Sequence, residues 1–419
     1  MTVATSMAAT VMLAVAFSAF SQSPASAPTP LAQLLAEAQR NNSQIAAAHD
    51  AWQAAKEVPR QVRALPDPTF TYQNLSVGSP KPFAGYTTSN FAYIGIGASQ
   101  EFLYPGKLKL REEVAERQAD TSGMAVNATA ASIDDAVKVD YIHLAYLQQA
   151  LGILGENQHV LDQLIRDATA HYEVGQSSQA DVLQAQVERT KIVREMTAAN
   201  QQLGDTEADL KELLHRDQDS PDIVADPLNE HPLQCTSAGL LALVRQHNPQ
   251  IQVDASSLRE EHAALASAKR EGKPDFGLSY MWQQTDRKYP DYYMFTFNLR
   301  LPRKGRVRAE VEEAAAKLAQ SQDTLDAHLQ QQFAQVRRGY IDVKSDEELL
   351  NEYQQGLIPQ SDAAYRSTLN SYARGRDVMT HVLLYFGNVL DMKLNEAQVL
   401  ADHETTLAHL ETLTGVTLR

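Results

Sequence analysis

The sequence predicts a mostly α-helical protein with a small β part, in which the second half of the chain repeats the first. The main observation is a set of landmarks that return about 200 residues later in the same order. Two further observations are long helical stretches without proline and four short segments that alternate with period two. A period this long is too large for a solenoid of small repeats. We therefore infer a duplicated protomer built around long antiparallel helical hairpins.

The recurring landmarks also locate the two repeats. Tyr172-Glu173-Val174-Gly175 returns as Tyr372-Ala373-Arg374-Gly375, and Asp181-Val182-Leu183 returns as His381-Val382-Leu383. Upstream of these are three more pairs: Tyr104-Pro105-Gly106-Lys107 with Leu301-Pro302-Arg303-Lys304, Leu65-Pro66-Asp67-Pro68 with Lys273-Pro274-Asp275, and Asn42-Ser43-Gln44-Ile45 with Asn248-Pro249-Gln250-Ile251. We expect a first structural repeat over 28–216, a linker over 217–236 and a second repeat over 237–419.

Composition narrows the class of partner. The chain has 419 residues and a formal net charge of −15, so it offers no large basic face and we expect no nucleic-acid partner. No run of twenty apolar residues follows the N-terminal segment, so we expect no transmembrane helix. Cys235 is the only cysteine, which leaves neither a disulfide framework nor an N-terminal cysteine for a lipid anchor.

The N-terminal segment resembles an export signal. An apolar run over 7–20 is followed by small residues, which predicts a signal peptide over 1–21, with cleavage as late as 27 as the alternative. No lysine or arginine precedes the apolar run, so the pattern is incomplete. A buried N-terminal helix is the other interpretation.

Each half begins with a helix and continues into two strands. In the first half we expect a helix over 31–64, ended by prolines, and strands over 69–77 and 90–102. The second half repeats the pair in 276–282 and 293–301. Strands of nine to eleven alternating residues have the length that crosses a bilayer when tilted, although a small soluble sheet with one buried face shares the pattern. The expected membrane belt consists of Phe91, Tyr93, Tyr292, Tyr293, Phe295 and Phe297.

Four strands cannot close a membrane barrel. The smallest closed barrels have about eight strands, and an open sheet edge cannot lie in lipid with unpaired backbone groups. Several copies of the chain must therefore each contribute a share of one barrel. Oligomerisation follows from the strand count.

After each strand pair comes a helix of unusual length. From 107 to about 172 there is no proline, and apolar residues follow a heptad pattern that resumes beyond Gly175. A helix of about 65 residues is a rod on the order of 100 Å long. In the second half we expect helices from 304 to about 373 and from 377 to about 414, with a kink at Pro359.

These features together resemble the TolC family of outer-membrane efflux channels. The resemblance rests on Tyr172-x-x-Gly175 and Tyr372-x-x-Gly375, each placed between two long helices of a duplicated unit. It implies a homotrimer in the outer membrane of a Gram-negative bacterium, with a shared 12-stranded β-barrel and an α-barrel that extends into the periplasm. It also implies contact with outer-membrane lipid and two protein partners, a periplasmic membrane-fusion adaptor and an inner-membrane pump.

The exported substrate is less well defined by the sequence. Leu65-Pro66-Asp67-Pro68 with Pro105-Gly106-Lys107 resembles the branch that serves heavy-metal pumps of the resistance-nodulation-division type, so we expect heavy-metal cations. A drug-efflux or type I secretion duct is the alternative, and a periplasmic coiled-coil adaptor is the rival from another class. No catalytic motif is present, and no His, Met or Cys cluster has metal-ligand spacing. We therefore expect no enzyme activity, no cofactor and no resident metal.

The candidate functional site is formed by the two helical turns. The resemblance implies that they are the periplasmic tip where the adaptor docks, through Val174, Gly175, Gln176, Ser177, Arg374, Gly375 and Arg376. The charged groups after each turn would form the pore constriction, namely Asp181, Asp377 and His381. Simple solvated turns are the alternative. We also expect the basic residues after the strands to lie near lipid phosphate, with a solvated helix start as the alternative for each: Lys107, Arg111, Lys304, Arg306 and Arg308.

Overall fold

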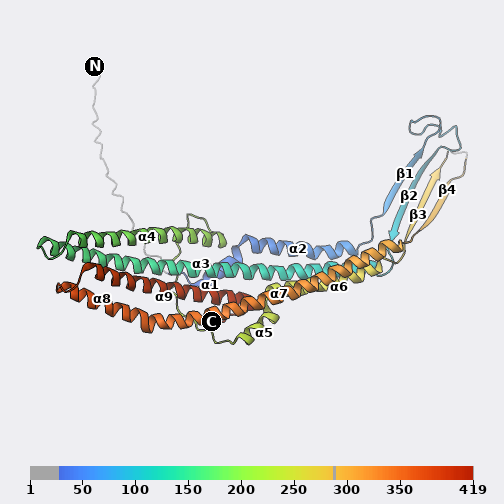
Figure 1. Ribbon diagram of the computed structural model, residues 1–419. Coiled ribbons are helices and arrows are strands. Elements are labelled where there is room, and N and C mark those ends of the chain that lie inside the picture. Colours follow the sequence, from blue (N-terminus) through green and yellow to red (C-terminus); the bar gives the residue numbers. More distant parts are fainter. Residues whose placement is uncertain (1–27, 286–288, 419) are drawn as a thin grey trace, which may run out of the picture.

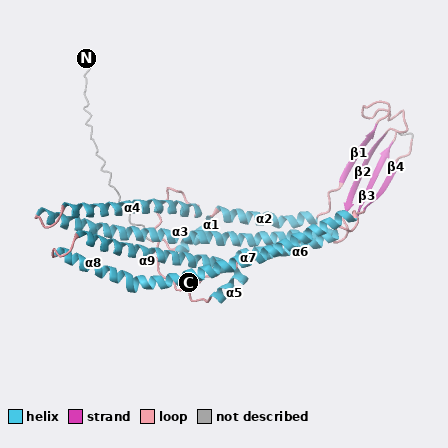
Figure 2. Ribbon diagram, in the orientation of Figure 1, coloured by secondary structure: helices cyan, strands magenta, loops and turns pink. Residues whose placement is uncertain are grey.

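The computed structural model describes residues 28–285 and 289–418, and it is an elongated molecule with a sheet at one end (Figure 1). The signal peptide expected over 1–21 lies outside these residues. Helices make up the rest of the length, and the two helical turns lie at the end opposite the sheet (Figure 2). The mostly α fold with four strands is confirmed.

The first repeat runs from α1 to α4. It contains α1 (Leu31–Asn41), α2 (Ser43–Arg63), β1 (Thr69–Leu75), β2 (Tyr93–Phe102), α3 (Lys107–Glu173) and α4 (Gln179–Leu213). The second repeat has the same order. It contains α5 (Ser237–His247), α6 (Pro249–Arg270), β3 (Asp275–Gln284), β4 (Tyr292–Arg300), α7 (Lys304–Glu352), a π-helical turn η1 (Tyr353–Leu357), α8 (Ile358–Ala373) and α9 (Met379–Thr414).

The helix expected over 31–64 is wrong in one respect, because it is broken at Asn42. The Asn42 side chain accepts hydrogen bonds from the N–H groups of Gln44 and Ile45 and so caps α2, while its amide donates to the Leu213 carbonyl at 2.9 Å. Asn248 does the same in the second repeat, capping α6 and donating to the Leu413 carbonyl at 2.8 Å. A cap that also binds a distant helix end fixes the angle between short and long helices.

Other boundaries differ from expectation by a few residues. β1 stops at Leu75 and β2 starts only at Tyr93, because 76–92 form a loop. Near Pro359, where a kink is expected, the helix contains the π-helical turn η1. Pro359 itself lies in the first turn of α8, where a missing N–H costs least. α9 begins at Met379, two residues later than expected.

The core follows the heptad positions of the long helices. Leu161, Leu164 and Ala168 of α3 pack with Ala185 of α4 and with a row of α9 side chains near the turns: Met379, Val382, Leu383, Phe386 and Leu390. Two matching clusters lie at mid-length, one around Leu34 and one around Leu240. α3 thus lies between α4 and α9, and it joins the two repeats (Figure 1). None of the described helices is long and apolar enough to span a bilayer.

Candidate functional site

The four strands form one antiparallel sheet in the order β1-β2-β3-β4, with two different faces. The register aligns Phe70 with Ala98, Ala98 with Tyr280, and Tyr280 with Phe295. Large side chains therefore share one face and are exposed there: Phe70, Tyr72, Ile96, Tyr280, Tyr293, Phe295, Phe297 and Leu299. The opposite face carries small and polar residues, including Gly95, Gly97, Ser99, Thr296 and Asn298.

This register separates the residues of the expected membrane belt. Tyr293, Phe295 and Phe297 lie on the apolar face. Tyr93 and Tyr292 lie on the opposite face, because each is one residue out of phase with the apolar positions of its strand. Phe91 lies in the loop before β2 and is exposed. The alternation along the strands contained this information, since period two assigns neighbouring residues to opposite faces.

The glycines of β2 allow close packing on the small-residue face. A Cβ added at Gly97 would lie 2.8 Å from the Tyr280 carbonyl oxygen and 3.0 Å from the Met281 side chain. A Cβ at Gly95 would lie 3.1 Å from the Gln283 side chain. These positions lack side chains to relieve crowding between β2 and β3, which is a structural role.

The junction of the sheet with the helices is held by buried ion pairs. Lys107 is almost fully buried, and its Nζ lies 2.9 Å from Asp275 Oδ2 and 3.2 Å from Glu271. Arg111 also binds Glu271, at 2.7 Å. The expectation that Lys107 meets lipid phosphate is therefore wrong, because its charge is already paired inside the protomer. Arg306 and Arg308 pair with Glu310 and Glu312 one turn along α7.

At the first helical turn, well-defined hydrogen bonds end α3 and begin α4. Gly175 takes a φ of 76°, its N–H binds the Tyr172 carbonyl, and the Gln176 N–H binds the His171 carbonyl. This is the paired pattern of a Schellman motif. Ser178 and Asp181 then form a reciprocal capping box that starts α4. Asp181, which was expected at the constriction, is therefore also a helix-capping group.

The second turn ends α8 in the same way as the first turn ends α3, but α9 begins differently from α4. Gly375 has a φ of 67° and binds the Tyr372 carbonyl, and the Arg376 N–H binds the Ser371 carbonyl. Val378 replaces the capping serine and has no side-chain cap. The Asp377 carboxylate instead accepts from the Val378 N–H at 2.8 Å and contacts His381 Nδ1 at 2.6 Å. The Val378 N–H and then His381 lower the pKa of Asp377.

The two turns are joined by groups that the sequence did not single out. Thr380 of α9 donates to the Gln184 side chain of α4 at 2.9 Å, and the rings of His171 and Tyr372 lie 5.9 Å apart. Tyr372 is buried in the core near the turns, where burial and then Asp181 raise its pKa. Val174, Gln176, Arg374 and Arg376 remain exposed. No group of three or more His, Cys, Asp or Glu side chains that could hold a metal occurs within 28–285 and 289–418.

A sheet with an exposed aromatic face, joined to two long helical hairpins, is the arrangement expected of an outer-membrane channel protein. The family model described as outer membrane efflux protein matches residues 34–215 and 240–416. The chain therefore belongs to the outer membrane efflux protein family, and it is an efflux channel that extends into the periplasm, not an enzyme.

Solved structures agree with this fold at low sequence identity. CusC is 17% identical, with a TM-score of 0.80 over 95% of this chain and 96% of that chain. The outer membrane protein VceC from Vibrio cholerae is 16% identical, with a TM-score of 0.77 over 93% and 97%. The Campylobacter jejuni CmeC outer membrane channel is 14% identical, with a TM-score of 0.79 over 92% and 85%. No curated protein matches the chain.

Proposed function

We propose that the protein works as a homotrimer, a passive duct that carries substrate from a periplasmic adaptor and an inner-membrane pump across the outer membrane. The observation that carries this proposal is the open four-stranded sheet. Its large side chains are exposed on one face, and β1 and β4 are edge strands whose outer backbone groups have no partner strand among the described residues. Three copies would close the sheet into twelve strands, which leaves no edge in lipid.

Membrane fractionation combined with chemical crosslinking tests the assembly. We expect the protein in the outer-membrane fraction, with crosslinked products up to the mass of three chains. The trimer should separate into monomers in SDS without crosslinker. A monomer recovered from the soluble periplasmic fraction would contradict the proposal.

The two helical turns are the proposed docking site for the adaptor. Backbone around Gly175 and Gly375 is open, since a Cβ at either position would meet no atom within 4 Å. A hairpin from a partner can therefore approach closely. Replacing both glycines with leucine puts side chains onto positive-φ residues at this surface and should abolish export while trimers persist. Normal export by that variant would reject the docking site.

The pore constriction is proposed at Asp181, Asp377 and His381. Threefold symmetry would bring three copies of each charged group around one aperture, where like charges repel and opposite charges of neighbouring chains attract. Neutralising Arg376 and Asp377 together should raise the single-channel conductance in planar bilayers. An unchanged conductance would leave these residues as solvated turn groups.

Heavy-metal cations are the proposed substrates. The support is the resemblance of the Leu65–Pro68 and Pro105–Lys107 segments to the heavy-metal branch. A deletion strain should become sensitive to copper, silver, zinc, cobalt or cadmium salts. Sensitivity confined to dyes and antibiotics would instead support a drug-efflux duct, which is the second candidate.

A further inference from the structure

The four strands of the sheet carry very few charged side chains. Within the described strands these are Glu101 of β2, Asp275 of β3 and Arg300 of β4. All three lie on the face opposite the large apolar side chains, since Glu101 pairs with Gly277 and Asp275 pairs with Arg300 in the register. They also lie together at the end of the sheet that joins the helices. Charge on the polar face is therefore confined to one height.

One of these three charges is already used at the junction with the helices. The Asp275 carboxylate accepts the Tyr104 N–H at 2.8 Å and binds the Lys107 ammonium at 2.9 Å. The Lys107 side chain is 1% exposed, so this pair belongs to the interior of the protomer. Glu101 and Arg300 are left as the charged groups that face solvent on the polar side of the described strands.

Glu101 and Arg300 form an ion pair that crosses β3. Arg300 Nη1 and Glu101 Oε1 lie 2.6 Å apart, although β2 and β4 are not neighbouring strands. Gly277 lies between them in the sheet and has no side chain. Packing does not require glycine at this position, because a Cβ would meet only ordinary contacts at 3.7 and 3.8 Å. A longer side chain at 277 would, however, occupy the space that the ion pair crosses.

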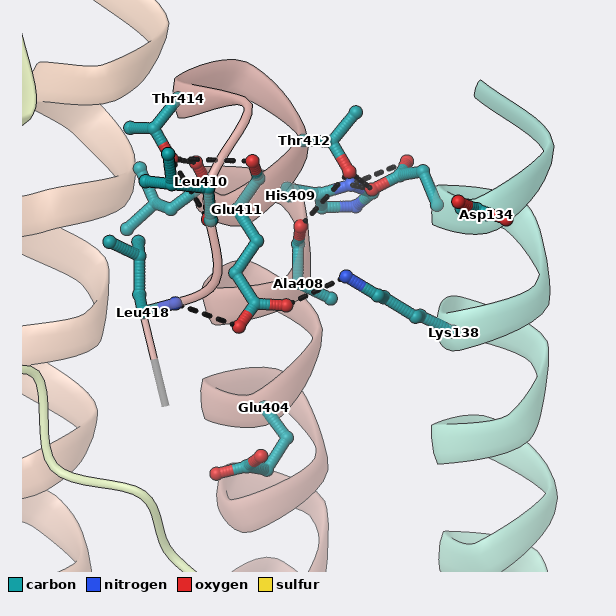
Figure 3. Close-up of polar contacts among 12 residues, drawn as sticks. Asp134, Lys138, Glu404, Ala408, His409, Leu410, Glu411, Thr412, Thr414 and Leu418 are labelled. Atoms are coloured by element: carbon teal, nitrogen blue, oxygen red, sulfur yellow. Dashed lines mark hydrogen bonds and ion pairs between the residues drawn. The ribbon is translucent and has the colours of Figure 1, made fainter. Parts of the chain in front are cut away.

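This ion pair is exposed, unlike the pairs that hold the helices together. The Arg300 side chain is 72% exposed and the Glu101 side chain is 36% exposed. Between α3 and α9, in contrast, Lys138 binds Glu411 at 2.7 Å, and the Glu411 side chain is only 4% exposed (Figure 3). Exposed ion pairs add little to stability. Stability therefore gives little reason for the Glu101–Arg300 pair, and its place on the polar face needs another explanation.

We propose that Glu101 and Arg300 form a charge-balanced collar inside the barrel, which makes the duct indifferent to the sign of the charge on a permeating ion or cargo. The inference rests on the proposed trimer, because the polar face surrounds the lumen once the apolar face meets lipid. Three copies then place three ion pairs around the lumen at one height. Each intact pair is neutral, whereas either partner alone would present three like charges that attract ions of opposite sign.

Cysteine labelling in outer-membrane vesicles tests which face surrounds the lumen, in full-length protein with Cys235→Ser. Asn298→Cys lies beside Gly277 on the polar face and should react with charged, membrane-impermeant thiosulfonates. Phe297→Cys, one residue earlier in β4 and on the apolar face, is the matched control and should stay unlabelled in lipid. Labelling of position 297 as fast as position 298, or faster, would overturn the placement of the collar.

The Asn298→Cys reporter also measures the charge of the collar. With the pair intact, cationic and anionic thiosulfonates should react with a rate ratio close to that for a free thiol in water. Arg300→Gln should raise the cationic-to-anionic ratio about fivefold at low ionic strength, and Glu101→Gln should lower it about fivefold. The double variant should return the ratio to within about twofold of the parent. Arg366→Gln, which breaks an exposed ion pair of α8, is the matched control and should change nothing. Single variants without effect would contradict the inference.

Ion selectivity in planar bilayers measures the consequence for transport. Under a salt gradient the parent protein should pass cations and anions in a ratio close to that of their mobilities in water. Arg300→Gln should shift the permeability ratio toward cations and Glu101→Gln toward anions, each by at least about threefold, and the double variant should restore it. Labelling ratios that change while the permeability ratio stays as in the parent would overturn the collar as the determinant of selectivity.

Glutaraldehyde crosslinking separates failure of the collar from failure of the proposed trimer. Trimers that form conducting channels but keep the same selectivity in both single variants would overturn the collar and leave the proposed function intact. Monomers that form no channels would overturn both, because the polar face would then surround no lumen.

Discussion

The two repeats share one scaffold but differ in the groups that finish each helix. In both, a buried asparagine caps the second short helix and binds the end of the long hairpin, through Asn42 and Asn248. At the helix that follows each turn, the first repeat uses a serine–aspartate capping box and the second uses Asp377 with His381. The geometry was kept after duplication, while the side chains that achieve it changed.

The difference follows from what each position faces. α3 of the first repeat packs against α9 of the second repeat inside the protomer, whereas α7 of the second repeat lies on an open flank. Lys107 is therefore buried and paired, and Lys304 is exposed. Positions that face inward in only one repeat are free to diverge in the other, so each such pair supplies its own matched control.

The largest expected effect is at the base of the sheet. Lys107→Ala leaves Asp275 and Glu271 without the ammonium group that they share, and removing one partner of a buried pair costs about 3–5 kcal/mol of unfolding free energy. Lys304→Ala should change the same quantity by less than about 0.5 kcal/mol within a single protomer. Urea unfolding followed by circular dichroism in detergent measures both. Equal effects would show that the two junctions do not differ as described.

The ends of α4 and α9 provide the next comparison. Gly415 has a φ of 67°, and a Cβ there would lie 2.4 Å from the His247 carbonyl oxygen. His215, the counterpart, holds a φ of 54° with a full side chain. Gly415→Ala should cost roughly 2–4 kcal/mol, from left-handed strain and from the backbone clash. His215→Gly should be neutral or stabilising by up to about 1 kcal/mol, because it removes strain without creating a clash.

Thermal melts of these two variants, run beside the parent protein, decide this prediction. Similar melting temperatures for Gly415→Ala and the parent would mean that the α9 end can move away from His247.

Much of this architecture was predictable from the sequence, because it depends on residue types that recur with a regular period along the chain. The heptads of α3 and α4, the four alternating strands and the positive φ at Gly175 and Gly375 all follow from local patterns. The residues of the helical turns were found for the same reason, since glycine between two long helices indicates a reversal.

What was not predictable depends on distant partners. The break at Asn42 needs the Leu213 carbonyl, and burial of Lys107 needs Asp275, which is 168 residues away. Nothing near Lys107 in the sequence distinguishes an internal ion pair from a lipid contact. Aromatic content alone predicts the membrane belt, whereas the phase within each strand decides that Tyr93 and Tyr292 lie on the face opposite the large apolar side chains.

A smaller effect is expected where the helical turns restart. Ser178→Ala removes one side of the capping box of α4 and should cost about 1 kcal/mol. Val378→Ala, at the equivalent place in α9, should cost much less through capping because that valine makes no side-chain cap. Hydrogen exchange of amides in the first turn of each helix reports this locally. Faster exchange at α4 only is the expected result, and equal acceleration at both would contradict it.

The smallest expected effect is on the pH dependence of the unfolding free energy, which His409 and the equivalent position of the first repeat should influence in different pH ranges. The hydrogen bond with Asp135 raises the pKa of His409, against the opposing effect of burial. The stabilisation that protonated His409 adds to the free energy of unfolding is fully present below the pKa of about 6.5 in the unfolded chain. It is lost as pH rises through the higher pKa of the folded protein. The His409 ring is half exposed, so we expect less than about 1 kcal/mol.

In the first repeat the equivalent position is Asp209, beside Asp140, and the window differs. Burial and then Asp209 raise the pKa of Asp140 from 3.8 to about 6, so this pair disfavours the folded state increasingly as pH rises from about 4 to 6. Unfolding of full-length protein between pH 4 and pH 8.5 separates the two groups. Asp140→Asn should flatten the acidic part of the stability profile, and His409→Gln should flatten the part above pH 6.5. Variants that alter the same part of the profile would show that the two repeats respond to protons through one coupled network, and the comparison between the repeats would then fail at this height.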